Sequence, residues 1–256
     1  MARVLKNRFY YFTGKTTIFL LLSVVFFFAP LEASAQRRFS KTYPASRNVR
    51  INLMNRSGTV IVEGWNRSEV QVQAYLETPA AAINPQLVEG TLFINMVKDN
   101  YGRGDVGPVN FTIRVPFDAM VDIETRIGNL NVTNVRGALV RAKISSDGDI
   151  TLTNISAKVV SAENGIGNIF FDGDIQSGGI YRFTSTSGDI NLRVPFNSSF
   201  RLVATAPSTR SINLGSFAGG DLRFVGDGRR VTGRFGDGSS SLTVTNQRGS
   251  IAFIRR

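Results

Sequence analysis

The sequence predicts an all-β solenoid, and three observations support this prediction. A Gly-x-apolar-x-apolar segment recurs along the chain, its middle copies are spaced by 19 to 22 residues, and helical periodicity is almost absent after residue 36. Self-similarity at such a period is typical of solenoids, in which each unit buries its apolar side only by stacking on its neighbours. An antiparallel β-sandwich is the alternative, because it also needs alternating strands between frequent turns.

The first 35 residues have the pattern of a signal peptide. Four basic residues precede an apolar run over residues 18–29, and Ala33–Ala35 supplies the small residues of a cleavage site. The apolar run is shorter than a membrane-spanning helix requires. We therefore expect cleavage near Ala35–Gln36 and export of residues 36–256 to the periplasm, the cell surface or the medium. The mature chain would keep 26 Lys/Arg against 18 Asp/Glu, a net charge of +8.

The repeated segments begin at an anchor residue, which is glycine in every copy except one. Two residues after each anchor stands Val, Leu or Ile, and four residues after it stands a large apolar side chain. The anchors are Gly58, Gly90, Gly128, Gly148, Gly167, Gly188, Arg210 and Gly249. From their spacing we expect residues 41–117 to form an irregular first part and residues 118–256 to form regular coils of about 20 residues.

Each coil is expected to contain a strand, a glycine turn and a second strand. Glycine tolerates a positive φ, and the Asp, Asn, Ser or Thr that follows it commonly hydrogen-bonds its own backbone in turns. Stacking should bring Ile150, Ile169 and Ile190 into one apolar ladder. The chain ends on an apolar strand and Arg255–Arg256, so we expect these charges to protect the end of the stack from pairing.

The composition excludes several kinds of site. The chain has no Cys and no His, which removes disulfides, thiolate or imidazole metal sites and every His-based catalytic triad. The remaining basic residues are scattered, and the aromatic residues carry no nucleic-acid signature, so no nucleic acid is expected as a partner. An exported basic protein would instead meet phosphate- or carboxylate-bearing envelope polymers, glycans or a membrane protein. The sequence indicates no cofactor.

Acidic residues beside the glycine turns are the candidate metal or catalytic groups. Asp147, Asp149 and Asp189 could bind calcium, and Asp149 and Asp189 could act on a glycan if stacking places them across a sugar ring. Asp beside Gly is also what a turn selects on its own, which is the interpretation we favour. Asn residues at the same and nearby repeat positions (Asn129, Asn131, Asn168, Asn191 and Asn213) predict a polar ladder on the outer face.

Trp65 is the only tryptophan and the one candidate for a binding surface. An exposed indole could stack on a sugar or anchor a partner, whereas a buried one would cover the open N-terminal end of the core. We expect any activity to lie in the parts that do not repeat, namely residues 78–108, the Trp65 end and residues 219–241.

The segment Val115–Thr125, followed by Gly-Asn-Leu and then by repeated Gly-Asp-Ile copies, resembles the bacterial adhesin-like domain family of unknown function. The residues from Asn55 to Trp65 are similar to that family's opening pair of strands. The resemblance covers roughly residues 45–254 and departs from the family at Arg210. It implies a right-handed, single-stranded β-helix that is exported or membrane-anchored, and it brings no catalytic residues.

These features together favour a non-enzymatic envelope protein that serves as a binding or structural scaffold. Two other functions stay open at this point. The first is an envelope-stress or regulatory module that acts through a protein partner, and the second is a carbohydrate-active enzyme built on the solenoid.

Overall fold

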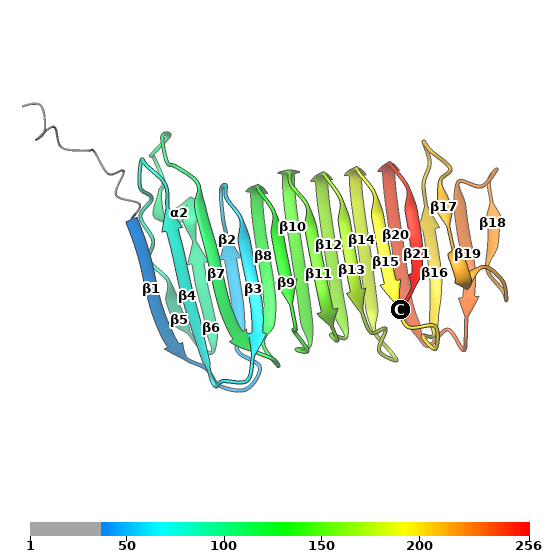
Figure 1. The fold of residues 1–256 in the computed structure, drawn as a ribbon, viewed down its shortest axis with the longest axis horizontal. Helices are drawn as coiled ribbons and strands as arrows, with labels where there is room; N and C mark the ends of the chain where they lie inside the picture. The colour runs from blue at the N-terminus through cyan, green and yellow to red at the C-terminus, as the bar shows by residue number, and fades with distance from the viewer. Residues whose placement is uncertain (1–36) are drawn as a thin grey trace, which may run out of the picture. The chain divides into compact units, whose positions relative to one another are not determined.

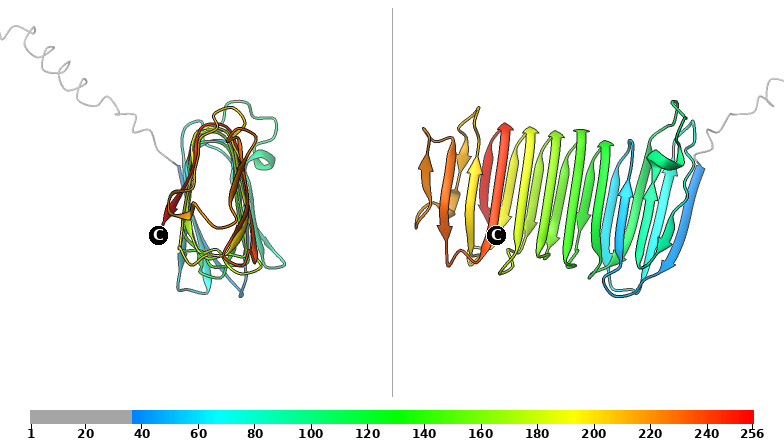
Figure 2. Two further views of the ribbon diagram at one scale, coloured as in Figure 1. Left: turned by 90° about the vertical axis from the view of Figure 1, so that its right-hand side faces the viewer. Right: turned by 180° about the vertical axis from the view of Figure 1, so that it is seen from behind.

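The structure is a computed structural model that describes residues 37–256, and almost all of these residues lie in two large β-sheets. The predicted signal peptide and its cleavage site lie outside the described residues. The two sheets face each other along one stack of coils, with the core between them (Figure 1; Figure 2). Within residues 37–256, helix is confined to the single turn α2 (Met96–Asp99) and the 3-10 turn η1 (Gly215–Phe217). Neither could span a membrane.

Sheet A contains ten strands and sheet B contains eleven. The spatial order in sheet A is β1 (Arg37–Pro44), β4 (Glu69–Leu76), β7 (Val109–Pro116), β3 (Val60–Trp65), β9 (Leu130–Thr133), β11 (Ile150–Ile155), β13 (Ile169–Gly173), β15 (Ile190–Val194), β21 (Ile251–Arg255) and β17 (Ile212–Asn213). The order in sheet B is β18 (Arg223–Val225), β19 (Arg230–Phe235), β16 (Phe200–Thr205), β20 (Ser240–Arg248), β14 (Ile180–Ser187), β12 (Val159–Ile166), β10 (Leu139–Asp147), β8 (Met120–Ile127), β2 (Arg50–Met54), β6 (Thr91–Asn95) and β5 (Gln86–Val88).

Pairing within both sheets is mostly parallel. Antiparallel pairs occur only towards the ends of the stack, where β1 and β4, β4 and β7, β5 and β6, β16 and β19, and β18 and β19 meet. The all-β prediction is confirmed, and two mixed, mainly parallel sheets agree with a solenoid. The antiparallel sandwich does not describe this pairing.

The core is a set of apolar ladders that cross the strands. Leu130 pairs with Ile150, Ile150 with Ile169, and Ile169 with Ile190, and all four side chains are fully buried. Sheet B faces them with the ladder Val121, Val140, Val160 and Tyr181. Burial of an aliphatic side chain contributes roughly 1.5–3 kcal/mol, so each extra coil adds its own share of core. The predicted ladder of isoleucines is confirmed.

The order of the coils departs from the order of the sequence. From β8 to β15 consecutive coils stack in sequence order, but the coil of β2 and β3 lies between β6/β7 and β8/β9. Likewise β20 and β21 lie between β14/β15 and β16/β17. The C-terminus therefore ends within the stack and not at its edge (Figure 1). The expectation that Arg255–Arg256 protect the end of the stack is wrong.

The inserted strand β2 is attached to its neighbour through a buried carboxylate. Asp122 on β8 is 3% exposed and accepts hydrogen bonds from Arg50 of β2 at 2.7 Å and from Arg141 of β10 at 2.6 and 2.9 Å. Charge-assisted bonds of this length are stronger than neutral ones and fix the lateral position of the strands they join. Asp122 thus ties the coil that is out of sequence order to the regular part of the stack.

The anchor glycines form a column along one corner of the stack. Gly128, Gly148, Gly167 and Gly188 all have φ between +112° and +143°, as predicted for the turn. The polar residue after each glycine was expected to hydrogen-bond its own backbone within the turn, and the structure shows a different partner. Its side chain accepts the backbone N–H of the equivalent residue in the next coil, as when Asn129 Oδ1 accepts from Asp149 N at 3.0 Å. The corner is thus a ladder between coils, and not a series of separate turns.

Candidate functional site

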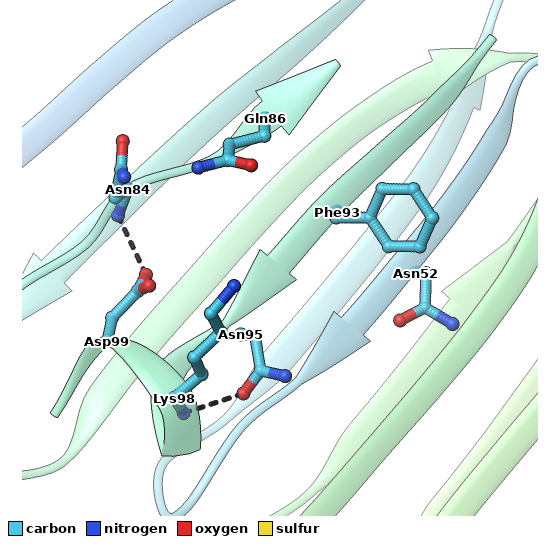
Figure 3. Close-up of a pocket in the computed structure, with 7 residues that line it drawn as sticks. All are labelled: Asn52, Asn84, Gln86, Phe93, Asn95, Lys98 and Asp99. Atoms are coloured by element: carbon cyan, nitrogen blue, oxygen red, sulfur yellow. Dashed lines mark hydrogen bonds between the residues drawn. The ribbon is translucent and has the colours of Figure 1, made fainter. Parts of the chain in front are cut away.

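A pocket lies where the non-repeating segment 78–108 joins sheet B. The hairpin of β5 and β6 turns at Glu89 and Gly90, whose φ values of 48° and 74° fit the tight turn that matches the twist of a hairpin. The hairpin extends sheet B beyond β2, and α2 folds over its end. Seven residues line the pocket between them: Asn52, Asn84, Gln86, Phe93, Asn95, Lys98 and Asp99 (Figure 3).

Strand register places the aromatic ring of the pocket between amides. Phe93 is the Cα partner of Gln86 on β5 and of Asn52 on β2, so the three side chains stand side by side on the outer face of sheet B. The ring is 45% exposed, while its neighbours Leu92 and Ile94 are fully buried. Because β6 is anchored through these two residues, Phe93 is presented to solvent on a rigid strand.

Hydrogen bonds fix the frame of the pocket. The Asp99 carboxylate accepts from the backbone N–H of Asn84 at 2.9 Å, and Asn95 Oδ1 accepts from the backbone N–H of Lys98 at 2.8 Å (Figure 3). Asn52 Nδ2 donates to Asp122 Oδ2 at 3.5 Å, which links the pocket to the buried carboxylate described above. Within residues 37–256, no protein hydrogen bond engages the side-chain amides of Asn84 and Gln86.

The composition of the pocket suits a polyhydroxylated ligand. Carboxamides offer donors and acceptors at the same time, as hydroxyl groups require, and Lys98 and Asp99 add one cation and one anion. An exposed aromatic ring offers an apolar face to C–H groups. Sequence reasoning pointed to residues 78–108 but to none of these side chains, because their proximity depends on the insertion of β2 beside β6.

Trp65 lies at the end of β3 and not at the end of the core, because β3 is flanked by β7 and β9. Its indole N–H donates to the Glu69 carbonyl at 2.9 Å. The guanidinium groups of Arg67 and Arg114 lie 4.9 and 6.0 Å from the ring centroid. The ring is half-buried and its face is occupied by cations, so it is less available for stacking than Phe93.

The acidic candidates Asp149 and Asp189 lie in the corner ladder. Asp149 Oδ1 accepts from Asn168 N at 2.7 Å, and Asn168 Oδ1 accepts from Asp189 N at 2.9 Å, so the two carboxylates are separated by one coil. Asn129 and Asn168 belong to the predicted polar ladder, whereas Asn213 bonds locally to Gly215 N. Asp147 is exposed just before Gly148. No cluster of three or more metal-ligating side chains occurs in the described part of the chain.

Hydrogen bonds lower the pKa of Asp189. Its Oδ1 accepts from the backbone N–H of Ser250 at 2.7 Å and from the Ser250 hydroxyl at 2.8 Å, and both bonds favour the ionised carboxylate. A general acid in glycoside hydrolysis needs a raised pKa, which is the opposite shift. The position of Asp189 therefore argues for a structural role.

Ser250→Ala is expected to raise the pKa of Asp189 towards its usual value of about 3.9, because the hydroxyl donor is removed. A lowered pKa in the folded state stabilises the fold above the unfolded-state pKa, and that stabilisation is lost as the pH falls through the folded-state pKa. The variant should therefore lose less stability than the wild type on acidification below about pH 4. Carboxyl NMR titration measures the shift, and Ser250→Thr, which keeps the hydroxyl, is the control. Identical titration of wild type and Ser250→Ala would contradict the assignment.

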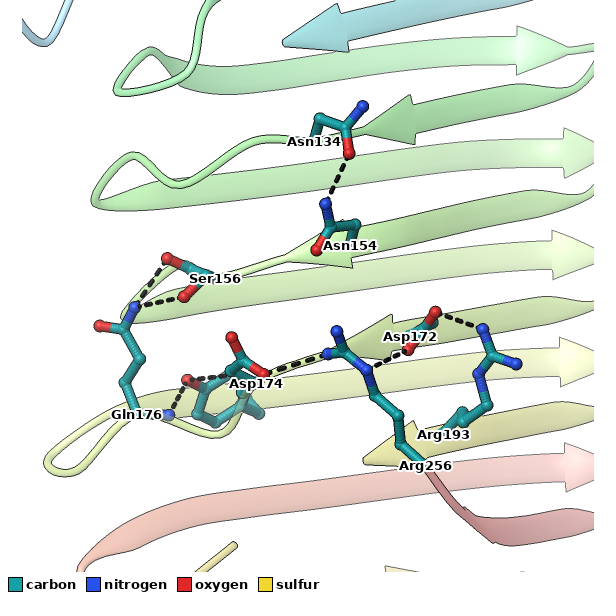
Figure 4. A network of polar contacts seen from close by, with 9 residues as sticks. Asn134, Asn154, Ser156, Asp172, Asp174, Gln176, Arg193 and Arg256 are labelled. Carbon is teal, nitrogen blue, oxygen red and sulfur yellow. Dashed lines mark hydrogen bonds and ion pairs between the residues drawn. The ribbon is translucent and has the colours of Figure 1, made fainter. Parts of the chain in front are cut away.

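A second polar cluster lies on the outer side of sheet A and holds the C-terminus. Asp172, 6% exposed at its side chain, accepts from Arg193 at 2.5 Å and lies 3.7 Å from Arg256 (Figure 4). Arg256 also pairs with Asp174 at 3.1 Å. Asp172 and Asp174 belong to the chain segment around β13, which lies two strands away from β21 in sheet A. The ion pairs therefore connect Arg256 to a coil that is not its immediate neighbour. This cluster attaches the second inserted coil, as Asp122 attaches the first.

Comparison with known proteins supports the fold and gives no activity. The fold is similar to that of a "putative cell adhesion protein" from Clostridium sporogenes, with a TM-score of 0.51, 12% identity and coverage of 86% of this chain and 100% of that chain. A "putative adhesin" from Bacteroides fragilis is more distant, with a TM-score of 0.36, 10% identity and coverage of 87% and 99%. No curated protein matches the sequence.

The sequence itself matches a family model over residues 46–217, which is more than half of the chain. That model is described as Toastrack DUF4097, a domain of unknown function. The expected kinship with an adhesin-like family is confirmed. This chain belongs to the Toastrack DUF4097 family.

Proposed function

We propose that this protein is an exported, non-enzymatic scaffold of the bacterial envelope that binds saccharide in the Phe93 pocket. The observation that carries the proposal is the exposed Phe93 ring, which stands between Gln86 and Asn52 on a rigid sheet. An aromatic face beside several carboxamides can take the C–H side of a sugar ring and bond its hydroxyls at the same time. Such binding needs no catalytic group.

Export rests on the sequence of residues 1–35, with cleavage near Ala35–Gln36. A right-handed β-helix with coils of about 20 residues is part of the same proposal. The names of the two structural neighbours, both of which mention adhesion, agree with a surface or envelope role for this chain. The enzymatic alternative is the weaker one, because the carboxylates of Asp149 and Asp189 each accept hydrogen bonds within the corner ladder, from Asn168 and Ser250.

Phe93→Ala is expected to weaken saccharide binding about tenfold, since an aromatic contact contributes roughly 0.5–1.5 kcal/mol beyond the apolar area that it buries and about 1.4 kcal/mol corresponds to tenfold. Gln86→Ala should weaken binding by a smaller factor, because it removes only hydrogen bonds. The full chain is first tested for retention on a panel of immobilised neutral glycans. The dissociation constants of the variants are then measured by calorimetry with the best ligand.

Phe224→Ala is the matched control, because Phe224 is 55% exposed and lies far along sheet B on β18. It should bind neutral glycans like the wild type. Equal glycan affinity of Phe93→Ala and Phe224→Ala would show that the pocket is not the binding site. Absence of retention on every glycan of the panel would contradict the proposal as a whole.

A further inference from the structure

Arginines gather on the outer face of sheet B, at the end of the stack opposite the Phe93 pocket. Five of them belong to four strands, β14, β16, β18 and β19, and we call this surface the arginine face. Its members are Arg182, Arg201, Arg223, Arg230 and Arg234, all exposed. The sequence spreads them over more than 50 residues, so their clustering is a product of the fold.

Strand register brings these side chains together. Arg201 on β16 is the Cα partner of Arg234 on β19, so their Cα atoms lie about 4.5–5.5 Å apart. Arg223 on β18 is the partner of Thr232, which stands between Arg230 and Arg234 on β19. Alternation along β19 sends Arg230, Thr232 and Arg234 outwards. A surface hollow is lined by side chains of this group together with Val203 and Thr232.

Ion pairs compensate part of the positive charge elsewhere on this outer face. Around β8 and β10, Asp122 pairs with Arg50 and Arg141, and Lys143 lies 3.6 Å from Glu124. On the arginine face the described residues include one ion pair only, between Arg234 and Asp221 at 3.4 Å, and both of its side chains are more than half exposed. Four of the five guanidinium groups on the arginine face therefore have no carboxylate partner within residues 37–256.

The arrangement of Arg201 and Arg234 does not favour folding. Like charges directly opposite one another destabilise an antiparallel pair. Places where a sequence departs from what stability favours are expected at functional sites. The opposed arginines indicate that this surface is adapted to an anion from outside the chain.

We propose that the arginine face binds an acidic polysaccharide that carries carboxylates. A guanidinium group matches a carboxylate with two parallel hydrogen bonds. Strands lie about 4.8 Å apart, so an extended polymer crossing β16 and β19 meets a new side chain at each step. Hydroxyl groups stand between the arginines and can bond sugar hydroxyls; they belong to Thr205, Thr232, Ser241, Thr243 and Thr245. The most exposed apolar side chains of this face, Ile180 and Val225, stand four strands apart on β14 and β18, with guanidinium and hydroxyl groups between them. This arrangement favours a sugar polymer over a lipid surface, which would require a continuous apolar face to insert.

This site is separate from the Phe93 pocket. The strands β6 and β19 are eight steps apart in sheet B, about 38 Å at the usual strand spacing. The two sites nevertheless share one outer face, and loss of one leaves the other intact. The arginine face can therefore be tested independently of the proposed neutral-saccharide function.

The test compares two double variants with the same change of charge. Arg201→Glu/Arg230→Glu reverses two charges on the arginine face, and Arg126→Glu/Lys158→Glu reverses two exposed charges elsewhere that make no ion pair within residues 37–256. Binding of the full chain to polygalacturonate is measured at low and at physiological salt. We expect at least a tenfold loss of affinity for the first variant and less than twofold for the second, while binding of neutral glycans through the Phe93 pocket is the same in both.

Arg201→Lys/Arg230→Lys keeps the positive charge and removes the planar guanidinium groups, which donate two parallel hydrogen bonds to a carboxylate. This variant tests the proposal if the glutamate variant fails to fold. We expect threefold to tenfold weaker polygalacturonate binding from this variant. Unchanged affinity in the lysine variant, or equal loss in the two glutamate variants, would overturn the proposal. Tighter binding to phosphatidylglycerol vesicles or to double-stranded DNA than to polygalacturonate would also overturn it, because the partner would then be a membrane or a nucleic acid.

Discussion

Gly188→Val is expected to destabilise the fold by about 3 kcal/mol or more, because it combines backbone strain with a steric clash. Gly188 has a φ of +120°, and a Cβ there would overlap the carbonyl oxygen of Gly167 in the neighbouring coil. The same relation holds down the corner column, where each glycine after Gly58 faces the carbonyl of the glycine before it and Gly58 faces that of Val109. The column consists of Gly58, Gly128, Gly148, Gly167, Gly188 and Gly249.

The size of the effect follows from two separate costs. A side chain held at positive φ costs of order 1–3 kcal/mol, and forcing atoms into a packed site typically costs another 1–3 kcal/mol. The backbone is held in place here, because the N–H groups of Gly167 and Gly188 donate to Ser187 and Arg248 of the adjacent coils at 2.8 and 2.9 Å. Domains are typically stable by only 5–15 kcal/mol, so the variant should unfold at a much lower urea concentration.

Substitutions at two other glycines distinguish the cost of backbone strain from the cost of the steric clash. Gly178 has a φ of +71° but nothing within 4 Å of an added Cβ, so Gly178→Ala reports backbone strain alone. Gly104 has neither a positive φ nor a close neighbour, so Gly104→Ala should change little. If Gly188→Val were no more destabilising than Gly178→Ala in urea unfolding, the close approach of adjacent coils would be refuted.

The repeat could be predicted from the sequence because each coil carries its own signal. Glycine at a fixed position, followed by two apolar residues in alternation, specifies a turn and an inward-facing strand whatever lies beside it. The positive φ of Gly148 and the ladder of Ile150, Ile169 and Ile190 follow from this local pattern. Arg210, which stands where other copies have glycine, also has a positive φ, but at 58° it lies outside the range of +110° to +143° of the corner glycines.

The order of the coils could not be predicted, because the same motif makes every coil an acceptable neighbour for every other coil. Single long-range contacts accompany the observed order, such as those of Arg50 with Asp122 and of Arg256 with Asp172. Both candidate sites, the Phe93 pocket and the arginine face, depend on this order of the coils. Phe93 meets Asn52 only because β2 is inserted beside β6, and Arg182 joins the arginine face across β20. Periodicity therefore identified the scaffold and left its binding surfaces undetermined.

Val244→Asp is expected to destabilise the C-terminal half of the stack by more than about 4 kcal/mol, since it places a charge in the core. Val244 lies on the inserted strand β20, is fully buried, and pairs with Phe183 of β14 on one side and Ala204 of β16 on the other. Loss of β20 leaves both neighbouring strands without their hydrogen-bond partners. Solenoids can open locally between coils, so the damage should be centred on this position.

Hydrogen exchange at β14 distinguishes the observed order from a stack in sequence order. If β20 were the last strand of the stack, Val244→Asp would expose β16 and β19 and leave β14 protected. Because β20 lies directly beside β14, we expect the amides of Tyr181 and Phe183 to lose protection together with those of β16, while β8 and β10 stay protected. Thr245→Asp is the matched control, because the adjacent side chain points outwards and should be tolerated. Retained protection at Tyr181 and Phe183 in Val244→Asp would show that the C-terminal coil is not inserted.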